Sequence, residues 1–203
     1  MDEKTGIQAL ERIHPTHSAK SGQVERVEFE YQRHGTQALM ANFEVATGKV
    51  IFPTIQDTRT EADFLAHIQQ LVESEPGGQW IFIADQLNTH KSASLVTWIA
   101  EQCAVKDESG EKGKAGILQD MPSRAAFLQD ESHQIRFIYT PKHYSWLNQV
   151  EIWLGILSRR LLKRGQFKST DELKERILQF IVFFNETLAK PFRWTYIGKP
   201  LVA

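Results

Sequence analysis

Three acidic residues that lie far apart in the sequence have side chains suited to metal-dependent phosphoryl transfer: Asp2, Asp85 and Glu151. Carboxylates from separate elements suit Mg²⁺ or Mn²⁺, which keep several waters and bind phosphate oxygens at their remaining positions. Two such ions about 4 Å apart can activate an attacking oxygen and stabilise the leaving oxygen. We therefore expect these acids to hold two ions, with water or a substrate hydroxyl as the nucleophile.

Each acid also has a simpler interpretation. Asp85 follows the apolar run at 80–84, at the carboxyl end of a predicted strand, where open α/β sheets gather their sites. An aspartate there can also cap a helix or form a turn. Glu151 shares a polar helix face with Asn148, as a solvated helix residue would. Asp2 alone resembles a frayed terminus. Position therefore supports Asp85 most directly.

Two histidines lie near these acids. His90 is about one helical turn beyond Asp85, where it is placed to orient a phosphate or a metal-bound water, and His143 precedes Glu151. A surface or hydrogen-bonded structural role fits each of them equally well. The single cysteine, Cys103, and the scattered histidines match no usual zinc-ligand spacing. The sequence thus favours oxygen ligands.

The elements that must position these residues alternate between strands and helices. Hydrophobic periodicity and turn residues predict a hairpin, a helix, a central strand buried on both faces, a second helix, a strand, and two final helices. Their expected locations are 36–55 for the hairpin, 60–72, 80–84, 88–103, 135–139, 146–161 and 169–184. The hairpin turn is expected at 46–48, helix N-caps at Thr60, at Asn88 and Thr89 and at Ser169, and Leu178 on the apolar face of the last helix. Residues 105 to 133 show no clear period and are expected to form a surface insertion. This order predicts an α/β fold with a mixed sheet.

Composition restricts the class of protein. The 203 residues are 41% hydrophobic and 24% charged, which predicts one domain over 1–203. No apolar run suits a membrane span or signal peptide, so we expect a cytoplasmic protein. The net charge of −1 argues against binding nucleic acid by bulk charge. A local basic segment is either a phosphate-binding surface or a solvated helix end; it comprises Arg159, Arg160, Lys163, Arg164 and Lys168.

Several motifs in a fixed order resemble a known family. They read DEKTGIQA at 2–9, YQRHGT at 31–36, DQLNTHK at 85–91, TPKHYSWLNQVE at 140–151, FNET at 184–187 and KPFRWT at 190–195. On these motifs the sequence resembles the bacterial insertion-sequence branch of the mariner-like DDE transposases. The resemblance covers the chain from Asp2 onward, apart from the expected insertion.

The resemblance implies an RNase H-like mixed sheet flanked by helices, with the first acid on the first strand, the second after the fourth and the third on a late helix. It also implies DNA cleavage at transposon ends and transfer of the 3′-hydroxyl ends into target DNA, typically at TA, by a nucleoid-associated protein that can act as a homodimer. Within the motifs, we expect support for the acids from Asn88, His90, His143 and Asn148. We expect DNA contacts from Lys91, Lys142, Trp146, Arg159, Arg160, Lys163 and Arg164.

Three features depart from the family pattern. Gln86 replaces an asparagine, and residues 105 to 133 lengthen the spacing between Asp85 and Glu151. Only Met1 precedes Asp2 in this sequence, so we expect the helix-turn-helix region of the family to be absent. One interpretation is a second reading frame joined by frameshifting to an upstream DNA-binding region. Another is a truncated, non-catalytic remnant that binds DNA or full-length transposase. A third is an RNase H-like nuclease acting on RNA–DNA hybrids, because the metal chemistry is shared.

Overall fold

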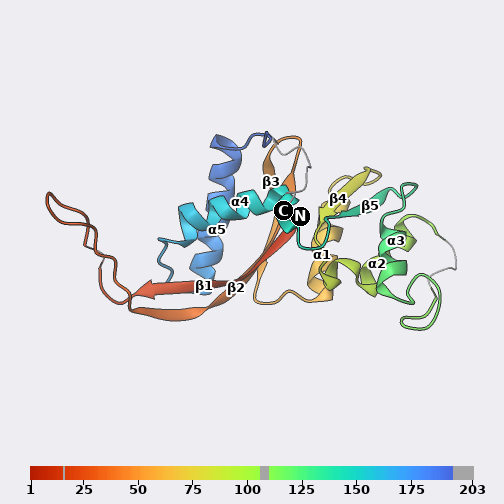
Figure 1. Ribbon diagram of the computed structural model, residues 1–203, viewed down its shortest axis with the longest axis horizontal. Helices are drawn as coiled ribbons and strands as arrows, with labels where there is room; N and C mark the ends of the chain where they lie inside the picture. The colour runs from red at the N-terminus through yellow and green to blue at the C-terminus, as the bar shows by residue number, and fades with distance from the viewer. Residues whose placement is uncertain (16, 106–109, 194–203) are drawn as a thin grey trace, which may run out of the picture.

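The computed structural model of the chain describes residues 1–15, 17–105 and 110–193, and it has an α/β architecture (Figure 1). Its strands are β1 (Asp2–Arg12), β2 (Tyr31–Glu44), β3 (Lys49–Gln56), β4 (Trp80–Ala84) and β5 (Ile135–Tyr139). Its α-helices are α1 (Glu61–Glu73), α2 (Ala93–Gln102), α3 (Met121–Leu128), α4 (Gln149–Leu157) and α5 (Thr170–Thr187). Shorter turns of helix are η1 (Asn88–Lys91), η2 (Ser145–Leu147) and the π-helical η3 (Ser158–Leu162).

The strands form two sheets within the described residues. β1, β2 and β3 make an antiparallel sheet in that order, and β4 pairs in parallel with β5. The two sheets meet at Met1, whose amine donates a hydrogen bond to the carbonyl of Ile83 (2.7 Å). Asp2, the first residue of β1, lies opposite Ala41 of β2. The start of β1 is therefore one place where the two halves of the protein join, and another is the Thr54–His67 contact between β3 and α1.

Each sheet has its own hydrophobic core. The antiparallel sheet packs against α4 and α5 around the fully buried Trp153, and Leu173, Ile177, Ile181 and Phe184 line the inner face of α5. The parallel pair packs against α1, α2 and α3 around Phe64 and Phe137. Figure 1 shows the two halves side by side, with β1 and β2 extending beyond α4 and α5 and residues 13–15 and 17–30 continuing them as an arm. The arm was not predicted.

Local signals predicted many of these elements. The hairpin of β2 and β3 is confirmed, as are α1 with its capping box at Thr60 and Asp63, β5, and the capping hydrogen bond from the Glu172 amide to Ser169. In addition, no helix among the described residues is long and apolar enough to cross a membrane.

The prediction that β4 is buried on both faces was wrong. Phe82 and Ala84 are buried, but Ile81 and Ile83 are 54% and 38% exposed. The apolar sequence predicted cover on both faces, yet the described elements cover this strand on one face and pair with it on one edge. The capping prediction at Asn88 and Thr89 was also wrong, because residues 88–91 form η1 and Ser92 caps α2.

Residues 105–133 are not a surface insertion along their whole length. Leu118 and Leu128 are buried in the core of the parallel pair, and the buried guanidinium of Arg124 donates to the carbonyl of Leu118. The helix α3, which begins with Asp120 as its N-cap, is short, and this hides its periodicity. Residues 106–109 of the stretch lie outside the described part of the chain.

Candidate active site

Asp2 is held at the junction of the two sheets. Its side chain is buried, and its Oδ1 accepts a hydrogen bond from the backbone amide of Glu3 (2.7 Å). Burial raises the pKa of Asp2 to about 6; the Glu3 hydrogen bond opposes this shift, while the charges of Glu151 and Asp85 add to it. Asp85 and Glu151 are therefore close enough to Asp2 to disfavour its ionisation.

Asp85 is the first residue after β4 and is only partly buried. Its Oδ1 accepts from the backbone amide of Leu87 (3.0 Å) and lies 2.8 Å from Nδ1 of His90. The hydrogen bond with His90 is the main cause that lowers the pKa of Asp85, although burial opposes it. This carboxylate is thus oriented by a neighbour five residues along the chain.

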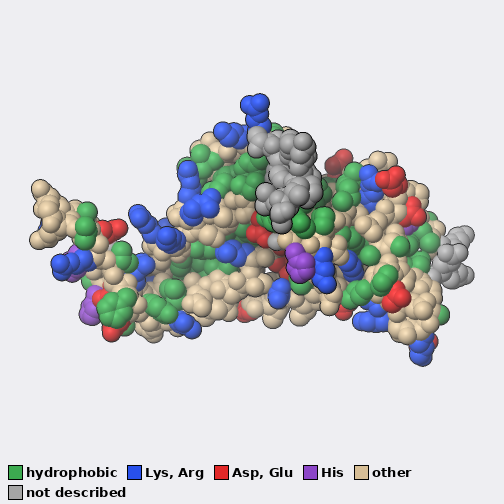
Figure 2. Space-filling view, viewed as in Figure 1, with side chains coloured by type: hydrophobic (Ala, Val, Ile, Leu, Met, Phe, Trp, Pro, Cys, Tyr) green, Lys and Arg blue, Asp and Glu red, His purple; other side chains and the backbone are tan. Residues whose placement is uncertain are grey.

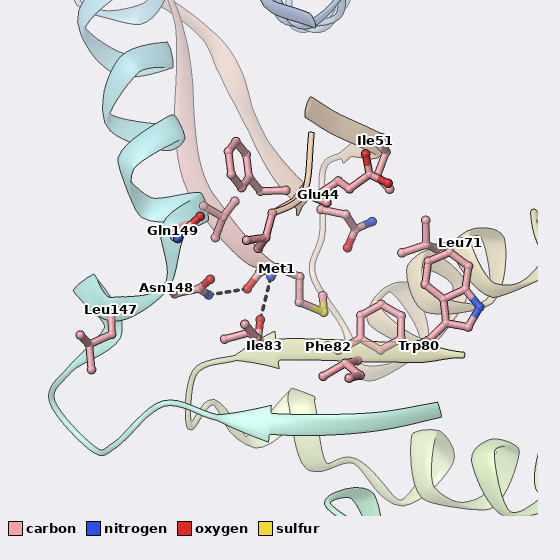
Figure 3. A pocket seen from close by; sticks show the side chains of 16 residues that line it. Met1, Glu44, Ile51, Leu71, Trp80, Phe82, Ile83, Leu147, Asn148 and Gln149 are labelled. Carbon is pink, nitrogen blue, oxygen red and sulfur yellow. Dashed lines mark hydrogen bonds between the residues drawn. The ribbon is translucent and has the colours of Figure 1, made fainter. Parts of the chain in front are cut away.

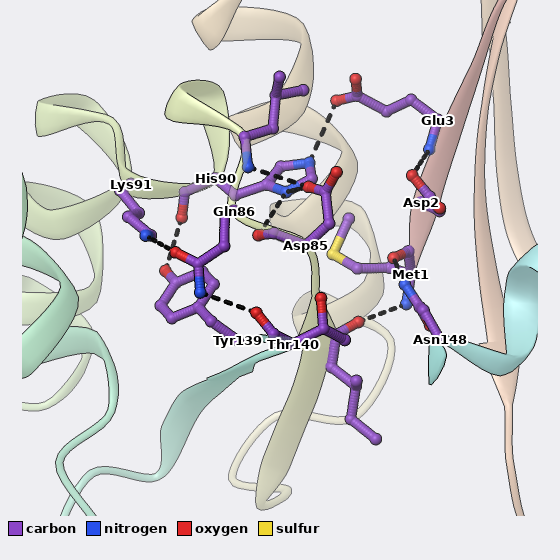
Figure 4. A network of polar contacts seen from close by, with 12 residues as sticks. Met1, Asp2, Glu3, Asp85, Gln86, His90, Lys91, Tyr139, Thr140 and Asn148 are labelled. Carbon is purple, nitrogen blue, oxygen red and sulfur yellow. Dashed lines mark hydrogen bonds and ion pairs between the residues drawn. The ribbon is translucent and has the colours of Figure 1, made fainter. Parts of the chain in front are cut away.

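His90 is a buried cation between two carboxylates (Figure 4). Its Nε2 lies 3.4 Å from Oε1 of Glu3, at ion-pair distance without a well-formed hydrogen bond. Burial disfavours its charged form, but Asp85 and Glu3 outweigh that effect and raise the pKa of His90 to about 9. The hydroxyl of Tyr139 donates to the backbone carbonyl of His90 (2.8 Å) and fixes η1 against β5. His90 accordingly orients Asp85 and Glu3, while its own side chain is fully buried.

The third acid lies on α4, which is tied directly to β1. Glu151 is exposed in the first turn of the helix. Asn148, the N-cap residue, is buried, and its Nδ2 donates to the backbone carbonyl of Met1 (2.7 Å). This bond links the helix of Glu151 to the residue before Asp2. Asn148 was predicted to support the acids, and its geometry gives it a positioning contact.

Gln86, one of the departures from the family pattern, connects the ends of β4 and β5. Its Nε2 donates to the backbone carbonyl of Thr140 (2.8 Å), and its Oε1 accepts from Lys91. The ammonium of Lys91 also lies 4.5 Å from the ring centroid of Tyr139, and partial burial lowers the pKa of Lys91. Lys91 was predicted to contact DNA, and in this structure its charge is engaged by Gln86 and Tyr139.

The other predicted residues lie on the surface of the protein. Asn88 is exposed at the start of η1, and Lys142, His143 and Trp146 are exposed between β5 and α4. Four predicted DNA contacts are exposed on or just beyond η3, namely Arg159, Arg160, Lys163 and Arg164. Figure 2 shows Lys and Arg side chains over the α4 and α5 part of the viewed face. None of these residues is among those labelled in the polar network of Figure 4.

Sequence reasoning missed Glu3. Its side chain is only 3% exposed and contacts His90 on one side and the guanidinium of Arg59 (3.3 Å) on the other. The carboxylate follows Asp2 directly in the sequence, and strand alternation places neighbouring side chains on opposite faces. That alternation could have indicated a separate role for Glu3, but only with the knowledge that β1 begins at Asp2.

The acids have the chemistry of a metal site without its full geometry. Within the ranges 1–15, 17–105 and 110–193, no group of three or more His, Cys, Asp or Glu side chains is arranged to hold an ion. The donor chemistry nevertheless suits a divalent cation, because Asp2 is buried beside two other acids whose charges raise its pKa. The residues thus fit a hard divalent ion by type and charge, without forming a complete ligand cage.

Comparison with known proteins identifies a family. A family model described as DDE superfamily endonuclease matches residues 1–174, which is most of the chain. No curated protein and no solved structure matches the chain. The matched range includes β1, β4 and α4 and therefore all three acids.

Proposed function

Because the chain belongs to the DDE superfamily endonuclease family, we propose that it is the catalytic domain of a DNA transposase. Endonucleases of this family generally use divalent metal ions and act on DNA. We propose further that this chain cleaves DNA strands at transposon ends and transfers the 3′-hydroxyl ends into target DNA, with TA as the preferred target. The observation that supports the proposal is that β1, the end of β4 and the start of α4, which contribute Asp2, Asp85 and Glu151, meet at Met1, where Asn148 bonds its carbonyl and its amine bonds Ile83.

Asp2, Asp85 and Glu151 would hold the divalent ions. When bound, such ions activate the attacking oxygen and stabilise the leaving oxygen in phosphoryl displacement. The chain's own residues position the carboxylates: His90 holds Asp85 by a 2.8 Å contact, and Asn148 ties α4 to β1. Reactant orientation accounts for a large part of catalysis, so these positioning contacts matter even though they touch no substrate.

The basic residues after α4 are proposed to bind the DNA backbone. Arg159, Arg160, Lys163 and Arg164 are exposed, and none of them forms an ion pair with an acid of the described residues. Removing one side chain that binds a phosphate should reduce the salt dependence of DNA affinity by a slope of about 0.9. Replacing Arg159 and Arg160 with alanine should therefore weaken binding and flatten that dependence, whereas replacing the exposed Lys112 and Lys114 should not.

Cleavage assays test the catalytic proposal. The purified chain is incubated with labelled duplexes that carry the terminal repeats flanking its gene, with Mn²⁺ or Mg²⁺. Nicking should be lost in Asp85→Asn and Glu151→Gln and retained in Glu175→Gln, an exposed glutamate of α5. Nicking that survives both site substitutions contradicts the proposed ligands, and a preference for RNA–DNA hybrids over duplex DNA contradicts the transposase assignment.

A non-catalytic role is the second candidate. It is favoured by one observation, that the described acids do not form a complete metal cage. Such a protein would bind DNA or a full-length transposase without cutting. Titration with Mn²⁺ separates the two roles. Binding of Mn²⁺ that depends on Asp85 and Glu151 supports catalysis. Unchanged DNA binding without any uptake of Mn²⁺ supports the second role.

A further inference from the structure

The start of β1 presents two neighbouring carboxylates to opposite faces of its sheet. Asp2 lies opposite Ala41 of β2, whereas Glu3 lies opposite Met40. Ala41 belongs to the core of the antiparallel sheet and Met40 to the core of the parallel pair. Residues directly opposite each other in an antiparallel pair point to the same face. Glu3 therefore points toward the half of the protein that contains β4, away from the face of Asp2.

Glu3 is a buried carboxylate with partners from two distant segments. Its Oε1 lies 3.4 Å from Nε2 of His90 in η1, and its Oε2 accepts a hydrogen bond from Nη1 of Arg59 (3.3 Å), just before α1. A carboxylate removed from water is costly unless it is paired, so these contacts hold Glu3 firmly between the two segments. The same contacts connect β1 to the half of the protein that contains β4.

His90 connects Glu3 to Asp85 through one rigid ring (Figure 4). Its other ring nitrogen, Nδ1, lies 2.8 Å from Oδ1 of Asp85, and the whole ring is buried. The ring packs against that of Phe64, with centroids 4.5 Å apart, and the Tyr139 hydroxyl bonds the carbonyl of His90. A closely packed ring has little freedom to turn, so the position of Glu3 at one nitrogen restrains the carboxylate at the other.

Backbone bonds of Met1 hold β1 on the other side of Asp2 (Figure 3). The amine of Met1 donates to the carbonyl of Ile83, and the carbonyl of Met1 accepts from the side chain of Asn148. These bonds fix the backbone before Asp2, but neither of them touches the side chain of Asp85. The orientation of the second acid relative to β1 therefore needs a separate contact.

We propose that Glu3 is a positioning residue of the active site, which acts through His90 to hold the carboxylate of Asp85. Because Glu3 follows Asp2 directly on β1, this contact sets the distance between Asp2 and Asp85. Arg59 supports the arrangement from the surface by holding the second oxygen of Glu3. The inference rests on the proposed function, since it takes Asp2 and Asp85 as ligands of divalent ions.

Amide hydrogen exchange at Leu87 tests the proposal without metal or DNA. The amide of Leu87 donates to Oδ1 of Asp85 (3.0 Å), so its protection reports how firmly that carboxylate is held. Glu3→Gln keeps the shape of the side chain and removes its charge, and it should speed exchange at Leu87 at least about tenfold. The amide of Val50, which bonds the side chain of Asn185 away from the acids, should exchange at its usual rate.

Variants of Arg59 give a milder form of the same test. Arg59→Gln should speed exchange at Leu87 by about threefold, because the guanidinium is half exposed and water replaces part of its contact with Glu3. Arg59→Lys keeps a cation at this single contact and should restore most of the protection. Glu175→Gln, at an exposed glutamate of α5, should leave exchange at Leu87 unchanged. If Glu3→Gln does not fold, the two Arg59 variants decide the question.

Cleavage gives a second readout of the same positioning. Loss of a group that orients a metal ligand costs about ten- to a hundredfold in activity, so Glu3→Gln should lower the single-turnover rate about tenfold while DNA affinity stays unchanged. Unchanged exchange at Leu87 in folded Glu3→Gln would overturn the proposal. Equal acceleration at Leu87 and Val50 would also overturn it, because that pattern indicates a general loss of stability. Protection of Leu87 that depends on Glu3 supports the positioning even if the protein cuts no DNA, whereas absence of cleavage counts against the proposed function alone.

Discussion

Replacing Asn148 with alanine should lower both the stability of the protein and its rate of DNA cleavage. The side chain of Asn148 is buried, and its amide donates to the backbone carbonyl of Met1 at 2.7 Å. Removing the donor leaves that carbonyl buried without a partner, which costs about 1–3 kcal/mol. In a chain of this size, this corresponds to a fall in melting temperature of roughly 3–10 °C. The change also frees the start of β1 from α4, and so shifts Asp2 relative to Glu151.

Displacement of a catalytic group by about 1 Å can cost a hundredfold in rate. We therefore expect Asn148→Ala to reduce metal-dependent DNA cleavage by about ten- to a hundredfold at a temperature where the variant is fully folded. Unfolding is followed by urea titration, and cleavage is measured on the same preparations.

Asn185 supplies the matched control. Its side chain bonds both the amide and the carbonyl of Val50, at 2.9 and 2.7 Å, and ties α5 to β3 away from the acids. Asn185→Ala should lower stability by a similar amount while leaving the rate of the folded protein nearly unchanged. Equal losses of cleavage in the two variants would refute the positioning role of Asn148.

Three further substitutions should each change the stability of the protein through the contacts of one side chain. Asp2→Asn should stabilise the metal-free protein by roughly 1–3 kcal/mol at pH 7 but not at pH 4, as urea titrations at both pH values would show. The reason is that the folded pKa of about 6 exceeds the usual 3.8, so ionisation of Asp2 costs stability as pH rises through 6. His90, whose pKa of about 9 exceeds the usual 6.5, stabilises the fold below pH 6.5 and loses that contribution as pH rises through 9, so His90→Gln should flatten the loss of stability over this range. Arg124→Met should cost about 2–4 kcal/mol in the same unfolding assay, because the carbonyls of Leu118 and Lys91 lose a buried donor. An effect of Asp2→Asn that does not vary with pH would contradict the first prediction. An unchanged pH dependence of stability in His90→Gln would contradict the second, and an unchanged free energy of unfolding in Arg124→Met would contradict the third.

Local patterns predicted the elements whose formation depends on neighbouring residues. The turn at 46–48 set the hairpin register of β2 and β3, and the caps at Thr60 and Ser169 set the starts of α1 and α5. The apolar run at 80–84 correctly placed Asp85 at the carboxyl end of β4. Turn chemistry and capping act over a few residues, so the sequence alone contains enough information to locate them.

Long-range packing decided the features that were mispredicted. The run at 80–84 resembles a strand buried on both faces, but cover depends on segments from elsewhere, and Ile81 and Ile83 remain partly exposed. The role of Glu3 depends on the arrival of His90 and Arg59 from distant parts of the chain. Leu178, predicted on the apolar face of α5, is 37% exposed because the helix turns it away from the sheet.

The position of Asp2 depends on forces that act in opposite directions at one junction. Burial and the charges of Asp85 and Glu151 disfavour the ionised carboxylate, whereas Asn148 and the Met1–Ile83 bond hold β1 in place through the neighbouring residue. A divalent cation would relieve that repulsion, and the Asn148 bond already supports the backbone before Asp2. Because the ion and the Asn148 bond both favour the same position of Asp2, losing the bond should weaken metal binding. Asn148→Ala should therefore lower the affinity for Mn²⁺, whereas Asn185→Ala, whose bonds to Val50 lie away from the acids, should leave it unchanged. Equal Mn²⁺ affinities in the two variants would show that Asn148 and the acids act independently.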